Sequence, residues 1–216
     1  MPTLLIATRN AHKVGEIQAL LGENFHCLTL KDFPAAPEVI EDAATFAGNA
    51  TKKAVELAQW LASDSRFTFH VSRTYILADD SGLEVDALNG APGVYSARFA
   101  AIDSDQAGNS PDAENNAKLL RLLKDVPAEK RLARFRCVIA LVEIPPRSAL
   151  RSPHLFDGTC EGRIDFAPRG ADGFGYDPLF VPDGFAQTFA ELGEVAKNQL
   201  SHRAKALARL RAELAW

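Results

Sequence analysis

Residues 3–22 read Thr-Leu-Leu-Ile-Ala-Thr-Arg-Asn-Ala-His-Lys-Val-Gly-Glu-Ile-Gln-Ala-Leu-Leu-Gly and combine a strand, a turn and a helix. The apolar run at residues 3–8 predicts a short buried strand. From Asn10 onward, apolar residues recur at helical spacing as far as Gly22, a residue type that commonly ends helices. We therefore expect the polar residues 8–13 to lie where a strand ends and a helix begins.

Similar patterns extend along the rest of the chain. They predict strands at residues 25–30, 75–78, 132–144 and 155–166, and helices at residues 46–61, 112–124 and 192–214. Two polar segments, 62–74 and 102–111, are predicted surface loops. Strands alternate with helices early, and the longer strands that follow are expected to be antiparallel. The predicted fold class is α/β, with a mixed sheet flanked by helices in a single domain over residues 1–216.

The composition excludes several classes of protein. There are 24 Lys and Arg against 28 Asp and Glu, so 24 − 28 gives a formal net charge of −4. Proteins that coat nucleic acid usually carry a basic excess, so nucleic acid is not expected as the main ligand. The apolar runs are far shorter than the roughly 20 residues that span a bilayer, so no membrane partner is expected. Sparse cysteines and the lack of a secretory signal indicate a cytoplasmic location.

Residues 8–13 are suited to binding an anion. Free N–H groups and the positive end of the helix dipole meet at a helix N-terminus, and Lys13 adds a full charge. The alternative is that Asn10 caps the helix and Lys13 is solvated. No Gly-x4-Gly-Lys-Ser/Thr motif is present, so this turn is not a P-loop.

Asp79-Asp80-Ser81-Gly82 follows the predicted strand at residues 75–78 directly. Adjacent carboxylates at a strand end repel each other unless a cation compensates. Mg²⁺ typically binds one or two carboxylates together with phosphate oxygens and water. A turn stabilised by an aspartate side chain is the alternative. Glu38 and Glu41, ahead of the helix at 46–61, are candidates to complete a metal site, with helix capping as the alternative.

Two further segments offer groups for a nucleobase and its sugar. Residues 172–178 read Asp-Gly-Phe-Gly-Tyr-Asp-Pro, in which glycines allow close backbone approach and Phe174 and Tyr176 offer flat faces. An aromatic-anchored turn is the alternative. Lys197 and the Ser-His-Arg run at 201–203 form a donor-rich patch at the start of the final helix, with a charged helix surface as the alternative.

Together these four motifs describe a site for a magnesium-bound nucleotide. They resemble the motifs of the inosine/xanthosine triphosphate pyrophosphatase family, whose members hydrolyse nonstandard purine nucleoside triphosphates. The likeness runs in the family's order from residue 4 to about residue 210, and it is carried by Ala-Thr-Arg-Asn-Ala-His-Lys (7–13), Asp-Asp-Ser-Gly-Leu (79–83), Gly-Phe-Gly-Tyr-Asp-Pro (173–178), and Lys197 with Ser-His-Arg (201–203). A Ser-His-Asp triad is not supported, because no Gly-x-Ser-x-Gly elbow is present.

The resemblance implies a cytoplasmic homodimer that converts ITP, dITP or XTP to the monophosphate and pyrophosphate with Mg²⁺. The expected fold has two lobes with the substrate cleft between them. Asp80 would be the general base and a metal ligand, Ser81 would touch substrate, and Glu41 is preferred over Glu38 as the second metal ligand. The phosphates would be held by Thr8, Arg9, Asn10, Ala11, His12 and Lys13, with Lys13 as the principal charge. The base and sugar would be bound by Phe174, Gly175, Tyr176, Asp177, Lys197, His202 and Arg203.

Two departures from the family pattern bear on these roles. Arg9 stands where the family usually has glycine, so it either strains the turn or adds a cation. Segments 62–74 and 102–111 are longer than usual. Two other functions are considered: a nucleotide-binding regulator without turnover, and an enzyme acting on modified pyrimidine triphosphates. The retained carboxylates at 41, 79 and 80 disfavour the first, and the Ser-His-Arg run disfavours the second.

Overall fold

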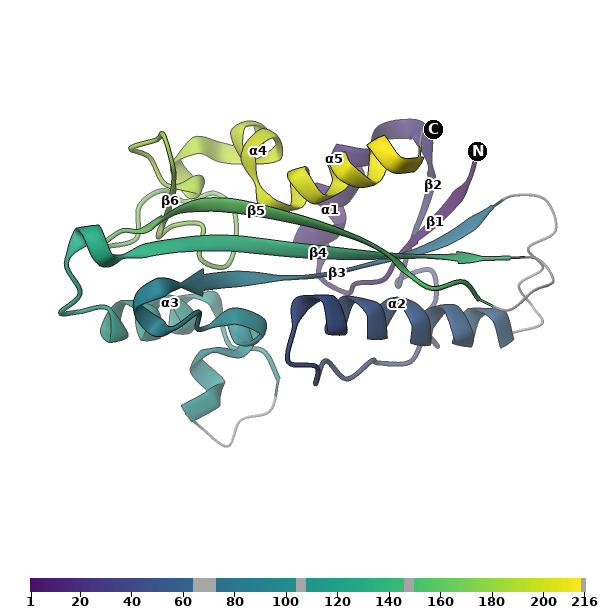
Figure 1. Cartoon of the computed structure of the whole chain (residues 1–216), viewed down its shortest axis with the longest axis horizontal. Helices are drawn as coiled ribbons and strands as arrows, with labels where there is room; N and C mark the ends of the chain where they lie inside the picture. Colours follow the sequence, from purple (N-terminus) through teal and green to yellow (C-terminus); the bar gives the residue numbers. More distant parts are fainter. Residues whose placement is uncertain (64–72, 104–107, 146–149, 215–216) are drawn as a thin grey trace. The chain divides into compact units, whose positions relative to one another are not determined.

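The computed structural model describes residues 1–63, 73–103, 108–145 and 150–214 (Figure 1). Within these ranges, six strands form one sheet in the order β2-β1-β3-β4-β5-β6. The strands are β1 (Thr3–Ile6), β2 (His26–Thr29), β3 (Thr74–Val85), β4 (Leu132–Ile144), β5 (His154–Ile164) and β6 (Phe180–Pro182). The α-helices are α1 (Ala11–Leu21), α2 (Phe46–Ser63), α3 (Asp112–Leu122), α4 (Phe189–Leu200) and α5 (His202–Leu214). Short 3₁₀ helices are η1 (Gly22–Asn24), η2 (Asp86–Leu88), η3 (Gly93–Arg98), η4 (Ala100–Asp103) and η5 (Ala128–Lys130).

The sheet is mixed, as predicted. β1 pairs in parallel with β2 and with β3, whereas β5 pairs with β6 in antiparallel orientation. The α/β class is therefore confirmed. The chain divides into two compact units. Unit 1 consists of Met1–Asp80, Cys137–Asp157 and Ala206–Trp216, and unit 2 consists of Ser81–Arg136 and Gly158–Lys205.

Unit 1 places helices on both faces of its strands. Ile17 of α1 and Leu207 of α5 pack in one apolar core with Leu4 of β1 and Leu77 of β3. Successive side chains of a strand point to opposite faces, so Ile76 faces the other side, which α2 covers (Figure 1). In the part of β3 that belongs to unit 1, odd-numbered residues therefore face α1 and even-numbered residues face α2.

Unit 2 has a separate core that is rich in aromatic rings. It joins Leu83 and Val85 of β3 to Leu119 of α3, Phe135 of β4 and Phe189 of α4. Phe135 stacks on Phe189 with ring centroids 6.2 Å apart. The N-terminal end of α4 is fixed by a capping box, in which Thr188 and Glu191 bond to each other's backbone N–H groups.

Local sequence signals account for α1. Asn10 Oδ1 accepts hydrogen bonds from His12 N at 3.0 Å and Lys13 N at 3.2 Å, which satisfies two N–H groups of the first turn. Gly22 ends the helix at φ 64°, a conformation that glycine adopts without steric cost. The predicted strand, turn and helix are thus confirmed, although β1 ends at Ile6 and not at residue 8.

Three predictions about the elements are wrong. The strand expected at residues 75–78 continues to Val85, because Leu83 and Val85 carry the buried pattern beyond the polar residues 79–82. Asp79-Asp80-Ser81-Gly82 therefore lies inside a strand and forms no turn. The single helix expected at 192–214 is two helices, interrupted at Ser201, which is extended at φ −66° and ψ 158°.

The third wrong prediction is an omission, the short strand β6, whose three residues are buried and follow the glycine–aromatic segment. The predicted loops 62–74 and 102–111 lie partly outside the described residues, because 64–72 and 104–107 belong to the gaps. Among the described residues, every helix is too short or too polar to cross a membrane.

Candidate functional site

The polar turn between β1 and α1 uses its own side chains to close. Thr8 Oγ1 accepts from Asn10 N at 3.2 Å, and Asn10 in turn caps α1. Residues 9–12 are exposed, so this helix N-terminus is open to solvent. The capping role that was considered for Asn10 is therefore observed, and it coexists with an accessible helix end.

Lys13 is held by a carboxylate and is not a solvated side chain. Its Nζ lies 3.1 Å from Asp79 Oδ2, and the two side chains are 16% and 0% exposed. Lys13 projects from the first turn of α1, and Asp79 is an odd-numbered residue of β3 that faces this helix. The ion pair thus fixes the ammonium group beside the polar turn.

Asp80 projects to the opposite face of β3 from Asp79. Its Oδ2 accepts a hydrogen bond from Asn49 Nδ2 of α2 at 3.0 Å. The repulsion expected between the adjacent carboxylates is relieved by the alternation of the strand, because each has its own partner on its own face. Sequence adjacency therefore does not make Asp79 and Asp80 a joint ligand pair.

The environment of Asp80 favours a proton on its carboxyl group. Burial raises the pKa of Asp80 above its ordinary value, and the nearby charge of Glu41 acts in the same direction. The positive charges of Lys53 and Lys13 and the hydrogen bond from Asn49 oppose the rise. A carboxylate with a raised pKa is a stronger base than an exposed aspartate.

Lys53, which the sequence analysis did not single out, links β3 to the segment that bears Glu41. Its Nζ donates to the carbonyl oxygen of Asp79 at 2.7 Å and lies 3.0 Å from Glu41 Oε1. Glu41 is 35% exposed and Glu38 is an exposed residue. Contact with Lys53, and the effect on the pKa of Asp80, support the choice of Glu41 over Glu38. We refer to Lys13, Glu41, Asn49, Lys53, Asp79 and Asp80 as the carboxylate cluster.

Arg9, which stands where the family usually has glycine, has an ordinary backbone conformation and a hydrogen-bond partner. Among the described residues, Asn89 is the only non-glycine residue with positive φ, so Arg9 does not strain the turn. Its Nη2 donates to the carbonyl oxygen of Ala36 at 3.0 Å. Arg9 therefore ties the polar turn to the start of the segment that contains Glu38 and Glu41.

In unit 2, Lys197 forms a buried ion pair with Asp177. Lys197 Nζ lies 2.6 Å from Asp177 Oδ2, and the side chains are 5% and 2% exposed. The same carboxylate accepts from the backbone N–H of Phe174 at 2.8 Å, and the ammonium group lies 4.3 Å from the centroid of the Phe174 ring. The alternative of a charged helix surface is therefore wrong for Lys197.

The loop from Gly173 to Asp177 is held through both backbone polar groups of Gly175. Gly173 has φ 79°, and a Cβ there would overlap the Asp177 carboxylate. Gly175 N donates to Asp112 Oδ2 at 2.6 Å, and Gly175 O accepts from Asn116 Nδ2 at 3.0 Å. We refer to Asp112, Asn116, Phe174, Gly175, Asp177 and Lys197 as the loop cluster.

Tyr176 does not offer the flat face expected of it. Its ring belongs to the core of unit 2, and its hydroxyl donates to the carbonyl oxygen of Ser96 at 2.9 Å. Burial raises the pKa of Tyr176 well above its ordinary value. The aromatic-anchored turn is thus correct for Tyr176, whereas Phe174 remains partly exposed.

The Ser-His-Arg run lies where α4 ends and α5 begins. Ser201 Oγ accepts from Ala204 N at 3.2 Å and so caps α5. Arg203, which is 1% exposed, donates from Nη2 to Ser81 Oγ at 2.9 Å. His202 stacks on Phe135 with ring centroids 4.9 Å apart. Within unit 2, Ser81 and Arg203 are therefore direct neighbours.

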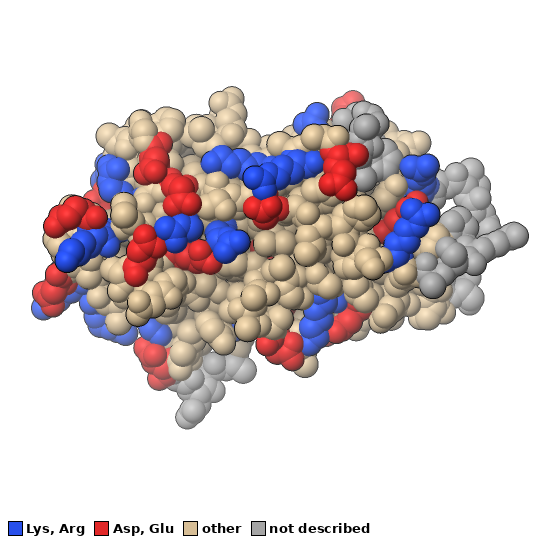
Figure 2. All heavy atoms as spheres, in the orientation of Figure 1, with Lys and Arg blue, Asp and Glu red and all other residues tan. Residues whose placement is uncertain are grey.

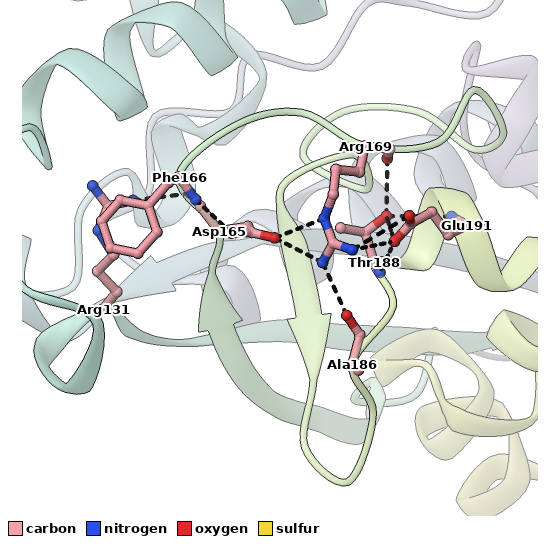
Figure 3. A network of polar contacts seen from close by, with 7 residues as sticks. All are labelled: Arg131, Asp165, Phe166, Arg169, Ala186, Thr188 and Glu191. Atoms are coloured by element: carbon pink, nitrogen blue, oxygen red, sulfur yellow. Dashed lines mark hydrogen bonds and ion pairs between the residues drawn. The ribbon is translucent and has the colours of Figure 1, made fainter.

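A network of charged side chains braces the segment that precedes this loop (Figure 3). Arg169 pairs with Asp165 at 2.7 Å and with Glu191 at 3.1 Å. Arg131 donates to the carbonyl oxygen of Asp165 at 2.9 Å and lies 3.9 Å from the centroid of the Phe166 ring. These contacts tie the segment to α4 and to the start of β4.

Comparisons with known proteins agree on one family. The model of the Ham1 family matches residues 4–213. The chain belongs to the Ham1 family. A protein named dITP/XTP pyrophosphatase from Desulforamulus reducens is 49% identical over 205 residues, which cover 94% of this chain and 91% of that protein. A protein of the same name from Geobacter sulfurreducens is 47% identical and covers 100% of this chain and 98% of its own length.

A solved structure gives the same result for the fold. The HAM1 protein from Coxiella burnetii is 37% identical and superposes with a TM-score of 0.79, covering 100% of this chain and 99% of that chain. The resemblance stated from the four motifs is therefore confirmed, as is the α/β fold expected for a Ham1 protein.

The surface of this Ham1 protein intersperses charges of both signs. On the face drawn in Figure 2, Lys and Arg side chains lie among Asp and Glu side chains. Arg134 pairs with Asp86 at 2.8 Å and with Glu161 at 3.0 Å. The described residues on this face form no continuous basic surface.

The donor set suits a cation that takes most of its ligands from elsewhere. Among the described residues, no group of three or more His, Cys, Asp or Glu side chains is arranged to hold a metal ion. Glu41 and Asp80 are close enough for the charge of one to raise the pKa of the other. Mg²⁺ fits such a pair, since it is usually bound by one or two carboxylates plus substrate phosphates and water.

Proposed function

We propose that this protein hydrolyses nonstandard purine nucleoside triphosphates, namely ITP, dITP and XTP, to the monophosphate and pyrophosphate. The products follow from attack of water on the α-phosphorus. Membership of the Ham1 family supports the proposal, as do relatives named dITP/XTP pyrophosphatase that match nearly the whole chain. Removal of such triphosphates from the nucleotide pool is the expected cellular role.

The observation that carries the proposal is the environment of Asp80. It is buried, its pKa is raised, and it lies among lysines and a second carboxylate. Asp80 orients the attacking water and accepts its proton as the oxygen bonds to phosphorus and the bond to the pyrophosphate oxygen breaks. Asn49 holds one oxygen of this carboxylate and so restricts its orientation.

Lys13 stabilises the negative charge that develops on the phosphate oxygens and on the pyrophosphate leaving group. Its ion pair with Asp79 orients the ammonium group before substrate arrives. Thr8, Asn10 and the exposed first turn of α1 supply further polar groups for the phosphates. We assign Arg9 mainly to its contact with Ala36.

Glu41 and Asp80 would hold Mg²⁺, which supplies, when bound, charge neutralisation on the phosphate oxygens and greater acidity of the attacking water. Lys53 contacts both Glu41 and the backbone of Asp79. It therefore holds the segment that bears Glu41 close to β3, which bears Asp80. The carboxylate of Asp80 must be ionised both to bind a cation and to accept a proton.

We assign recognition of the base and sugar to Phe174, Ser81, His202 and Arg203 of unit 2. Phe174 offers an aromatic face, and the Asp177–Lys197 pair fixes its backbone. Hypoxanthine and xanthine present an oxygen acceptor at position 6, which pairs with hydrogen-bond donors. Adenine presents an amino group there, and guanine presents an amino group at position 2. Each then faces a donor that it cannot satisfy, a mismatch that costs several kcal/mol.

A pyrophosphate-release assay with ITP, dITP, XTP, GTP and ATP tests this function. We expect turnover of ITP, dITP and XTP, weak turnover of GTP and ATP, and loss of turnover when the divalent metal is chelated. GTP turned over like ITP would refute the selectivity. Binding without pyrophosphate release would identify a nucleotide-binding regulator, and turnover confined to modified pyrimidine triphosphates would identify the other candidate enzyme.

We also propose that the enzyme acts as a cytoplasmic homodimer. The family resemblance supports the dimer, and the free thiols of Cys27, Cys137 and Cys160 suit a reducing compartment. Light scattering of the purified protein gives the mass in solution, and a monomer at micromolar concentration would contradict the dimer.

A further inference from the structure

One face of α2 carries two buried polar residues at i and i+4. Asn49 is 0% exposed and Lys53 is 8% exposed, in a helix whose other buried positions are mostly apolar. Residues at this spacing lie next to each other on one face of a helix. A polar residue is costly to bury unless its groups are hydrogen-bonded, so the contacts of Asn49 call for an explanation.

Asn49 makes two hydrogen bonds that run in opposite directions. Its Nδ2 donates to Asp80 Oδ2 at 3.0 Å, and its Oδ1 accepts from the backbone N–H of Ala43 at 2.9 Å. Reversing the amide would place its oxygen against a carboxylate and its NH₂ group against an N–H donor. The partners therefore fix the orientation of the amide without ambiguity.

The two partners of Asn49 belong to elements that are far apart in sequence. Asp80 lies on β3, whereas Ala43 lies two residues after Glu41 in a segment without regular secondary structure. Because backbone pairing does not fix such a segment, its position depends on side-chain contacts. Arg9 at Ala36, Lys53 at Glu41 and Asn49 at Ala43 supply them.

We propose that Asn49 is a positioning residue for the reaction, which sets the orientation of the Asp80 carboxylate and its placement relative to Glu41. This inference rests on the proposed function of Asp80 and Glu41. Asn49 acts through both elements at once, because one rigid amide bonds to each of them. A small displacement of a reacting group is enough to slow an enzyme by about 10²-fold.

Asn49→Asp separates this role from a purely structural one. An aspartate keeps the oxygen that accepts from Ala43 N, but it replaces the donor to Asp80 by a second carboxyl oxygen. If Asn49 only anchors the segment, this variant keeps its turnover. If Asn49 orients Asp80, turnover falls by about 10²-fold. The assay is run at alkaline pH so that the two carboxyl groups do not share a proton.

Asn115→Asp is the matched control. Asn115 is 2% exposed, accepts from Ala100 N at 2.8 Å and donates to the backbone oxygens of Ala97 and Ser110. The same substitution thus removes a buried amide donor from a site whose partners are all backbone groups. We expect it to lower thermal stability and to leave kcat for dITP near the wild-type value.

Three measurements decide the matter: kcat and KM for dITP with Mg²⁺, thermal unfolding, and hydrogen exchange at the Ala43 amide. We expect Asn49→Asp to lower kcat about 10²-fold with little change in KM, and to keep the Ala43 amide protected. Asn49→Leu, which removes both bonds, should lower kcat and also expose that amide. If Asn49→Leu does not fold, Asn49→Asp alone carries the test.

Each of three results would overturn the inference. The first is a wild-type kcat in Asn49→Asp, and the second is a KM for that variant that rises by the same factor by which its kcat falls. The third is a loss of kcat in Asn115→Asp equal to that in Asn49→Asp. These outcomes leave the proposed function intact, because the wild-type protein still releases pyrophosphate. A wild-type protein that releases none would instead remove the proposed function, and the inference with it.

Discussion

The carboxylate cluster of unit 1 and the loop cluster of unit 2 use the same residue types to different ends. In the carboxylate cluster, acidic side chains outnumber the lysines, Glu41 is 35% exposed, and burial raises the pKa of Asp80. In the loop cluster, the ion pair between Asp177 and Lys197 is closed, with side chains 2% and 5% exposed. The buried pair of Asp177 and Lys197 thus neutralises itself, whereas the three carboxylates of Glu41, Asp79 and Asp80 exceed the two lysines beside them by one negative charge.

Buried charges that support the backbone can thus be distinguished from buried charges that are suited to bind a ligand. A buried pair that satisfies itself fixes a backbone, as the Asp177 carboxylate does for Phe174. An unbalanced cluster beside an exposed helix N-terminus is suited to take up a cation and an anion together.

The largest effect is expected from Asp80→Asn. Asparagine keeps the size of the side chain but cannot accept the proton of the attacking water. We expect kcat for dITP to fall about 10²–10⁴-fold, the range that general-base catalysis usually supplies. Pyrophosphate release under saturating dITP measures it, and near-normal release would remove Asp80 from its catalytic role.

The stability of Asp80→Asn serves as its control. Since burial raises the pKa of Asp80, the folded chain binds this proton more tightly than the unfolded chain. The wild-type protein therefore loses stability as the pH rises above the unfolded value of about 3.9, whereas asparagine does not titrate. Asp80→Asn should be at least as stable as wild type near neutral pH, with an advantage that shrinks toward pH 4. Urea unfolding in chelator at both pH values checks the sign.

The next largest effect is expected on stability, from Lys197→Met. Removing the ammonium group leaves the Asp177 carboxylate buried without its cation, which typically costs about 3–5 kcal/mol. We expect a clear fall in the free energy of unfolding, measured by urea denaturation. Adding Asp177→Asn to this variant should restore part of the loss, because the buried charge is then gone.

Lys52→Met is the matched control in unit 1. Lys52 Nζ lies 2.6 Å from Asp42 Oδ1, the same separation as in the buried pair, but Asp42 is 65% exposed. Because water screens exposed pairs, this variant should unfold at nearly the wild-type urea concentration. Equal losses in the two variants would mean that burial does not distinguish the two ion pairs.

Much of the fold was predictable because local signals agreed with the final structure. The cap at Asn10, the terminator at Gly22 and the alternation over β4 each fixed an element from neighbouring residues alone. The extension of β3 through Asp79 and Asp80 was not predictable in this way. Polar residues inside a strand are stable there only because α1 and α2 provide partners, and those contacts are nonlocal.

The residues of the candidate site, like the extension of β3, were predictable only where local sequence identified them. Motif residues such as Lys13, Asp80 and Lys197 could be named from the sequence because they stand in recognisable runs. No role could be named from the sequence for Asn49 or Lys53, since the role of a buried polar pair on an apolar helix face depends on the groups that it contacts. For Lys53, the available signal was the position of a lysine on the apolar side of α2.

A smaller effect is expected from Asn116→Leu, which tests whether the loop cluster acts through the backbone of Gly175. The variant removes the donor to Gly175 O but keeps the bond from Gly175 N to Asp112. One neutral hydrogen bond contributes about 0.5–1.5 kcal/mol, so KM for dITP should rise by up to about 10-fold with kcat nearly unchanged. Steady-state kinetics measure this, and Asp112→Asn, which keeps an oxygen acceptor for Gly175 N, is the milder control. A fall in kcat without a change in KM would contradict the assignment.

The smallest effect is expected from Arg9, and it decides between two roles for the residue that replaces the family's glycine. If Arg9 acts as a tie, both Arg9→Met and Arg9→Lys lose a partly buried bond to Ala36 O that contributes about 0.5–1.5 kcal/mol. Both should then show faster hydrogen exchange in residues 36–42 and little change in KM. If Arg9 binds phosphate, Arg9→Lys keeps its charge and its KM, whereas Arg9→Met raises KM in a salt-dependent way. We expect faster hydrogen exchange with little change in KM, because the guanidinium group of Arg9 already donates to the carbonyl oxygen of Ala36. With glycine in this position, that oxygen would bond to water.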